Sequence, residues 1–282
     1  NLTNMKKLIF GIVLLGMFGF SNTTKAQVLT PDDDGIIPDP PKHYHNNMVF
    51  PYAHLREADM LWSTRHWESI DLRQKFNFHL YYPVQAIPDR KSLYDVVVDG
   101  ILNEGTIIEV FADDRFEIPY TPEQVFQYVQ MIDTLRDPDD PSIILLVDTI
   151  KITSKDVLEW QVKSDWYFDK QRGEMKNRII GISPVVRNPK TLDKYNLFWV
   201  WFPDARYALS THVAFNSRNN NQRLTYDQVF HLRVFQSRII KEDNVYDRQI
   251  EEYKRSSPLE QLLEADRIKN NLRDFEHDLW EF

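Results

Sequence analysis

Alternation of large apolar residues with polar ones between positions 158 and 169 is the feature that most constrains the fold. One face of this run carries Trp160, Val162, Trp166 and Phe168, and the other carries Gln161, Lys163, Asp165 and Tyr167. A period of two residues is typical of a β-strand with one buried and one solvent-exposed face. Turn residues at 171–173 lead into a second such run over 177–186. The sequence therefore predicts an antiparallel hairpin with one exposed face.

Further strands and helices are indicated along the rest of the chain. Apolar runs over 107–111, 143–152 and 197–202 predict strands that are buried on both faces, as in the centre of a sheet. Helix starts are predicted at Thr121, Thr225 and Ser257, because each is followed three residues later by Gln or Glu, as in a capping box. Two more helices are expected over 55–73 and 91–103. The predicted fold class is α+β, with a mixed, mainly antiparallel sheet, packed helices and an extended proline-rich N-terminal arm.

The beginning of the sequence carries the three parts of an export signal. Met5 and two lysines precede 13 apolar or glycine residues from Leu8 to Phe20, and a small-residue motif ends at Ala26. A run of this length is too short to span a bilayer, which takes about 20 residues. We expect cleavage between Ala26 and Gln27, with residues 1–4 upstream of the signal. The alternative, a buried N-terminal helix, leaves the two lysines before the apolar run unexplained.

The segment after the signal has a different composition from the rest of the chain. Residues 27–52 are rich in proline and aspartate, and include Pro38, Pro40 and Pro41. Such a composition predicts an extended arm with little packing of its own, which serves either as a strap onto a partner or as a spacer. The expected organisation is a signal over 1–26, the arm over 27–52 and an α+β region over 53–282 that ends in an amphipathic helix. One domain and two closely packed lobes both fit the length of that region.

Charge and cysteine content exclude several classes of protein. The chain has 34 Lys and Arg against 42 Asp and Glu, a net charge of −8, which argues against nucleic acid as a partner. Cysteine is absent, so the chain forms no disulfide, uses no thiolate and carries no lipoprotein-type acyl anchor. Beyond the signal no apolar run is long enough for a transmembrane helix, and we expect no direct membrane span.

No pattern in the sequence demands catalytic or metal chemistry. The glycines after the signal are not spaced for a phosphate-binding loop or a nucleophile elbow. His43 and His45 have the spacing of two metal ligands on a strand, but no third ligand follows. Asp113 and Asp114 lie in a polar setting, which does not raise a carboxylate pKa for acid catalysis. We predict a protein that is not an enzyme, with no catalytic residue, cofactor or metal.

Two surfaces are candidates for binding. The last helix carries a narrow apolar seam made of Ala265, Ile268, Leu272, Phe275 and Leu279. This seam docks either on the protein's own sheet or on a partner or neighbouring copy. Trp62 and Trp67 lie five residues apart on the predicted helix 55–73, so they cannot share a face and one of them is expected to be exposed. The candidate interface residues are thus Pro38, Pro40, Pro41, Trp62, Trp67, Ile268, Leu272 and Phe275.

Five long strings together resemble one family. They are Met60–Ser63, Trp67–Lys75, Leu158–Asp169, Arg178–Pro184 and Phe198–Pro203, the last followed by Arg206. These strings resemble the gliding-motility family GldN, called PorN in non-gliding relatives, and the resemblance runs through the whole chain after the signal.

The resemblance implies a non-enzymatic periplasmic component of the type IX protein secretion system of Bacteroidota. Members of that family assemble with the lipoprotein GldK (PorK) into a large ring beneath the outer membrane, and contact the periplasmic part of GldM (PorM). A lipoprotein partner would supply the anchor that a chain without cysteine lacks. The family carries no catalytic motif to transfer. An alternative from another class is a periplasmic hydrolase or a peptidoglycan-binding module.

Overall fold

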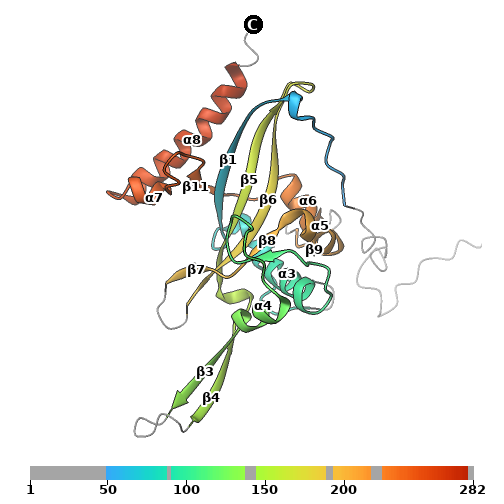
Figure 1. The fold of residues 1–282 in the computed structure, drawn as a ribbon, viewed down its shortest axis with the longest axis vertical. Helices are drawn as coiled ribbons and strands as arrows, with labels where there is room; N and C mark the ends of the chain where they lie inside the picture. The colour runs from blue at the N-terminus through green and yellow to red at the C-terminus, as the bar shows by residue number, and fades with distance from the viewer. Residues whose placement is uncertain (1–48, 88–89, 137–143, 189–192, 217–223, 279–282) are drawn as a thin grey trace, which may run out of the picture. The chain divides into compact units, whose positions relative to one another are not determined.

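The computed structural model describes residues 49–87, 90–136, 144–188, 193–216 and 224–278 (Figure 1). These residues lie within one compact unit, His43–Phe282. The largest sheet has seven strands in the order β11-β1-β5-β6-β8-β2, with β7 also paired to β6. Every strand pair of the described residues is antiparallel. The predicted α+β class with a mainly antiparallel sheet is therefore confirmed.

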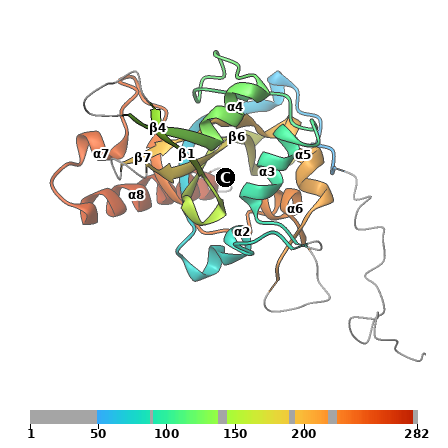
Figure 2. The ribbon, with the colours of Figure 1, turned by 90° about the horizontal axis from the view of Figure 1, so that it is seen from below.

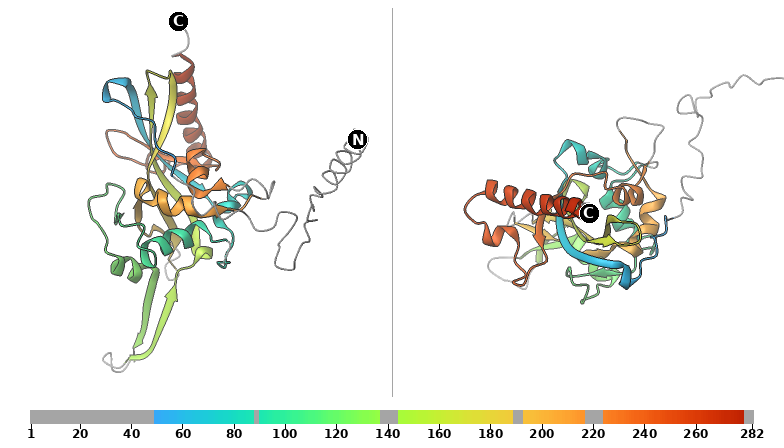
Figure 3. Two further views of the ribbon diagram at one scale, coloured as in Figure 1. Left: turned by 90° about the vertical axis from the view of Figure 1, so that its right-hand side faces the viewer. Right: turned by 90° about the horizontal axis from the view of Figure 1, so that it is seen from above.

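The strands of the large sheet differ widely in length. They are β1 (Met60–Asp71), β2 (Val110–Phe111), β5 (Val157–Asp169), β6 (Glu174–Arg187), β7 (Lys194–Asn196), β8 (Trp199–Trp201) and β11 (Arg238–Glu242). Two smaller sheets pair β3 (Gln130–Arg136) with β4 (Ile144–Lys151) and β9 (Val213–Ala214) with β10 (Leu224–Thr225). Figures 1 and 3 show the β3–β4 hairpin extending beyond the large sheet.

The helices divide into two groups by what they pack against. They are α2 (Phe78–Tyr81), α3 (Leu93–Leu102), α4 (Pro122–Val129), α5 (Phe202–Thr211), α6 (Tyr226–His231), α7 (Ile250–Tyr253) and α8 (Pro258–Asp278). Helices α3, α5 and α6 build the main core with β1, β5 and β6, around Trp160, Phe198 and Tyr226. Helices α7 and α8 pack instead on β11, the end strand of the sheet, in a separate small cluster. Figures 1 and 2 show the two groups on different sides of β1.

The predicted hairpin is present, but its second face is not open to solvent. Strands β5 and β6 pair over their whole length around the turn at Gly173, whose φ of 63° suits glycine. On the face that we predicted to be exposed, Lys163 is 5% and Tyr167 is 9% accessible. The reason is tertiary: the loop that carries Asp114 and Phe116 packs over Lys163, and Arg178 stacks on Tyr167.

Local capping signals predicted the helix starts correctly. Thr121 and Gln124 form a reciprocal capping box at the start of α4, and Thr225 and Gln228 form another at the start of α6. Helix α8 begins directly after Ser257, as expected. Helix α3 falls within the predicted 91–103.

The helix predicted over 55–73 is wrong, because this segment is the strand β1. Its backbone hydrogen-bonds to β5 along its length and to β11 over residues 66–69. Partners that lie about 100 and 170 residues away along the chain thus override the local pattern. The strand predicted over 143–152 is present as β4, but its predicted central position is wrong, because within the described residues β4 pairs with β3 alone. Strands β2 and β8 are shorter than predicted, and β8 ends at Trp201 because Phe202 already begins α5.

Candidate functional site

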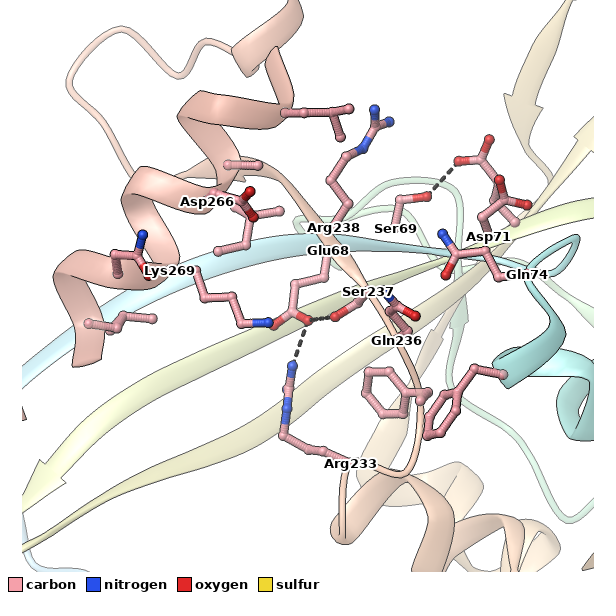
Figure 4. Close-up of a pocket in the computed structure, with 18 of the residues that line it drawn as sticks. Glu68, Ser69, Asp71, Gln74, Arg233, Gln236, Ser237, Arg238, Asp266 and Lys269 are labelled. Carbon is pink, nitrogen blue, oxygen red and sulfur yellow. Dashed lines mark hydrogen bonds and ion pairs between the residues drawn. The ribbon is translucent and has the colours of Figure 1, made fainter. Parts of the chain in front are cut away.

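A groove of about 1080 Å³ lies between α8 and the large sheet (Figure 4). One wall is the face of α8 that carries Leu262, Asp266 and Lys269. The other wall comes from β1 and from the segment that leads from α6 into β11. Aromatic side chains, among them Phe235 and Trp166, line the groove together with charged ones. A lining of this kind suits polypeptide better than a small apolar molecule.

An ion pair between a buried carboxylate, Glu68, and a partly exposed guanidinium, Arg233, lies in this groove. The carboxylate of Glu68 accepts hydrogen bonds from Arg233 Nη2, at 2.6 Å, and from the Ser237 hydroxyl. The guanidinium also donates to Asn177 Oδ1 at 3.0 Å, and stacks 5.1 Å from the ring centre of Trp166. Glu68 is therefore bonded within the protein, and its geometry is that of a structural bridge between β1 and the segment after α6.

A second carboxylate, Glu159, lies at the rim of the same groove. It accepts from the Ser69 hydroxyl at 2.5 Å and from Lys194 Nζ. Burial by itself raises the pKa of Glu159, but the hydrogen bonds from Lys194 and Ser69 outweigh it, and the net pKa is lowered. Glu159 is thus an ionised carboxylate at neutral pH.

Trp67 lies in a buried cluster of cations. Its indole Nε1 donates to Asp114 Oδ2 at 2.9 Å, while Lys241 Nζ and Lys163 Nζ lie 4.2 and 5.3 Å from the ring centre. Burial lowers the pKa of Lys163, and the charge of Asp114 partly offsets this effect. The neighbouring carboxylates Asp113 and Asp114 have separate partners: Asp114 accepts from Trp67, while Asp113 accepts from the backbone N–H of Glu117.

A third charged cluster fixes the first described residues of the chain. Arg206 on α5 forms a bidentate, buried ion pair with Asp227 on α6, with contacts of 2.7 and 3.1 Å. The same guanidinium donates to the backbone oxygen of Phe50 at 2.7 Å and stacks 4.2 Å from the ring centre of Tyr52. Burial raises the pKa of the Tyr52 phenol, against the opposing charge of Arg206. Phe50 and Tyr52 are therefore held against α5 through Arg206.

The structure places only some of the predicted interface residues. Trp62 is half-buried and stacks on Phe275 with ring centres 4.6 Å apart, while Trp67 is 7% exposed. The expectation of an exposed tryptophan is therefore wrong for this pair, because other side chains cover both of them. Phe275 of α8 packs on Trp62, and Asp114, Lys163 and Lys241 surround Trp67.

The apolar seam of α8 docks on the protein itself. Ala265 and Ile268 are buried against Ile239 of β11 and Ile250 of α7, while Leu272 and Phe275 are half-buried. Whether Ile268, Leu272 and Phe275 also serve an interface stays a prediction.

Other predicted residues lie outside the described part of the chain. These are Ala26, Gln27, Pro38, Pro40, Pro41, His43, His45 and Leu279. Among the described residues no group of three or more His, Cys, Asp or Glu side chains could hold a metal ion.

The sequence analysis did not predict the two ion pairs at the centre of these clusters. Glu68 and Arg233 are 165 positions apart, and Arg206 and Asp227 are 21 apart, with no local pattern that links them. The sequence carried a weaker signal for one of these residues: Arg206 lies three positions after the string Phe198–Pro203, which carries part of the family resemblance.

Comparison with known protein families identifies a match. The family model described as gliding motility associated protein GldN matches residues 55–281, which include every element from β1 to α8. No curated protein matches the chain. None of the described helices combines the length and the apolar character that crossing a membrane requires.

Proposed function

The chain belongs to the GldN family of gliding motility associated proteins, and we propose that it is a structural, non-enzymatic component of the type IX secretion and gliding machinery. In this proposal it forms a periplasmic ring with the lipoprotein GldK/PorK under the outer membrane, and contacts the periplasmic part of GldM/PorM. The observation that carries the proposal is the family match over residues 55–281, since it covers both groups of helices and the whole large sheet.

The geometry of the charged groups supports a structural role. Glu68 is bonded to Arg233 and Ser237, and Asp227 is bonded to Arg206. A catalytic acid or base must present an oxygen that exchanges a proton with a substrate, whereas these carboxylates accept hydrogen bonds from neighbours in the same chain. Their arrangement joins β1, α5 and α6 to distant segments, as a scaffold requires.

The proposed location rests on the N-terminal segment. An export signal over residues 1–26 would deliver the chain across the inner membrane, and the lipoprotein partner would then hold it at the inner face of the outer membrane. Neither step requires a membrane-spanning helix in this chain.

The proposal is tested by purifying a tagged chain from its native host under mild detergent. We expect co-purification with a lipoprotein and with the periplasmic part of the motor protein, in a particle of megadalton scale. A small monomer with saturable binding to peptidoglycan fragments would overturn the proposal and favour the glycan-binding alternative. Turnover of glycan or peptide by the purified chain would favour a hydrolase.

A further inference from the structure

Helix α4 exposes large apolar side chains in addition to those that it buries. Val125 and Val129, four residues apart on one face, are buried in the main core. Phe126 and Tyr128 lie outside that face and are 49% and 45% exposed. Packing within the chain therefore uses only part of the apolar surface of this short helix.

The loop between α3 and α4 continues this apolar surface. Ile108 and Ile118 are 77% and 57% exposed. Tyr120, at the end of the loop, stacks on Tyr128 of α4 with ring centres 5.1 Å apart, and its backbone N–H donates to the oxygen of Val110 at 2.7 Å. The loop and α4 are thus bonded to each other and to β2, the end strand of the large sheet.

Helix α5 fixes the first part of the same loop. Asp204 Oδ2 accepts from the backbone N–H groups of Ile108 and Glu109, at 2.7 and 3.0 Å. Figures 1 and 2 show α3 and α4 side by side. We call the exposed apolar residues of this region the α4 surface: Ile108, Ile118, Phe126 and Tyr128. Because backbone hydrogen bonds hold its loop in place, a partner would meet a surface that is already ordered, which lowers the entropic cost of binding.

The same part of the sequence carries a large excess of negative charge. Residues 92–135 contain nine Asp and Glu against one Arg, a net charge of −8, which equals the net charge of the whole chain. The single arginine, Arg115, is paired with Asp247, a residue outside this segment, at 3.6 Å. The acidic excess of the segment is therefore not neutralised from within it.

Several of these acids are exposed and have no cation beside them. Asp99 is paired with Lys91 at 2.7 Å, and Asp114 lies 3.9 Å from Lys163. In contrast, no ion pair between described residues involves the exposed glutamates Glu104, Glu109, Glu117 and Glu123. Glu109 and Glu117 directly adjoin Ile108 and Ile118 in the sequence, so the uncompensated charge lies beside the apolar side chains of the α4 surface. A surface of this kind attracts a partner of positive charge.

We propose that the α4 surface docks a basic segment of another protein, one in which lysine and arginine alternate with apolar residues. The cationic side chains of that segment meet Glu109 and Glu117, and its apolar side chains cover Ile118 and Phe126. Charge complementarity specifies the sign of the partner. The exposed apolar side chains specify a polypeptide, because a small cation would leave them in water.

Other occupants do not match the charge. A second copy that met this surface with its own α4 surface would bring like charges together. Nucleic acid and anionic lipid headgroups carry the same sign as the glutamates. The inference goes beyond the proposed function, and it holds whether or not the chain forms a ring.

Photo-cross-linking in the native host identifies the occupant. The photo-reactive amino acid p-benzoylphenylalanine replaces Phe126 in the full chain, and the cross-linked peptides are sequenced by mass spectrometry after irradiation. We expect attachment to a segment of another protein in which Lys and Arg outnumber Asp and Glu. Attachment only to a second copy of this chain, to lipid, or to a neutral or acidic segment would overturn the proposal, and so would the absence of any cross-link.

A control position shows whether the contact is specific. Leu259 is 63% exposed on α8, which packs on β11 at the opposite end of the sheet order from β2. The same photo-reactive residue at position 259 should not attach to the segment that is captured from position 126. Equal capture from both positions would contradict docking on the α4 surface.

Charge reversal separates local charge from overall charge. Glu109→Lys/Glu117→Lys should weaken binding of a synthetic peptide with the captured sequence about tenfold or more, and added salt should weaken binding to the unmodified chain. Glu251→Lys/Glu260→Lys changes the net charge equally, at exposed positions on α7 and α8, and should bind as the unmodified chain does. Equal losses in the two double variants would refute the proposal. A thermal melt of each variant confirms that it is folded.

Discussion

Arg206 Nε donates to Asp227 Oδ1 at 2.7 Å, with both side chains about 5% exposed or less. The pair joins α5 to α6, and Arg206 also holds the backbone of Phe50. Removing one partner of a buried pair leaves an uncompensated charge, which costs about 3–5 kcal/mol. Arg206→Ala should therefore lower the free energy of unfolding in urea by that amount. The double variant Arg206→Met/Asp227→Leu should lose clearly less, and an equal loss would contradict this account.

Gly181 provides the close approach between β6 and the loop that carries Phe116. A Cβ at this position would lie 2.5 Å from the Phe116 ring and 3.2 Å from the backbone oxygen of Val200. Gly181→Ala should therefore destabilise the fold by about 1–3 kcal/mol, the usual cost of overpacking. Gly181→Ala/Phe116→Leu should recover part of the loss in a double-mutant cycle, since the ring is the nearest obstacle. If the two substitutions changed the free energy of unfolding additively, the clash with Phe116 would not be the cause of the loss.

The lowered pKa of Glu159 predicts that the stability of the fold depends on pH in the acid range. Its folded-state pKa is lowered below the unfolded value of about 4.3, so the unfolded chain binds more protons between those two values. The carboxylate therefore contributes stability that is fully present above about pH 4.3 and is lost as the pH falls through the folded pKa. Glu159→Gln should cost about 1 kcal/mol at pH 7, because Lys194 is half-exposed, and the difference should shrink towards pH 3. A difference that stays constant from pH 7 to pH 3 would exclude Glu159 as the cause.

Processing of the N-terminus is the fourth prediction. The basic, apolar and small-residue parts of the signal place cleavage between Ala26 and Gln27. The intact mass of the exported protein should correspond to a chain that begins at Gln27, and Ala26→Arg should block processing. Retention of Met5–Ala26 in the mature protein would refute the predicted cleavage of the signal.

The proline-rich part of the arm, residues 28–41, is expected to strengthen assembly without contributing to folding. Deleting residues 28–41 while keeping the signal should leave the melting temperature unchanged, because the described core begins after this segment. Association with the lipoprotein and the particle size should decrease. Unchanged association with an unchanged melt would make the arm a spacer.

Local patterns in the sequence determine several helix starts, the long hairpin and the family of this protein. The capping boxes at Thr121 and Thr225 and the hairpin around Gly173 are formed by residues within a few positions of one another, so their chemistry can be read directly from the sequence. The family resemblance likewise rests on contiguous strings, and the match over residues 55–281 confirms it.

Only the tertiary structure decided which segments meet. Residues 60–71 are a strand because β5 and β11, far away in the sequence, supply their backbone partners. The same pairing turns Trp67 towards Lys163 and Lys241, and brings Glu68 to Arg233. Such contacts depend on strand order and register, which are set by packing of the whole sheet rather than by any local propensity. The groove under α8 exists for the same reason, because it lies between elements that no stretch of sequence places side by side.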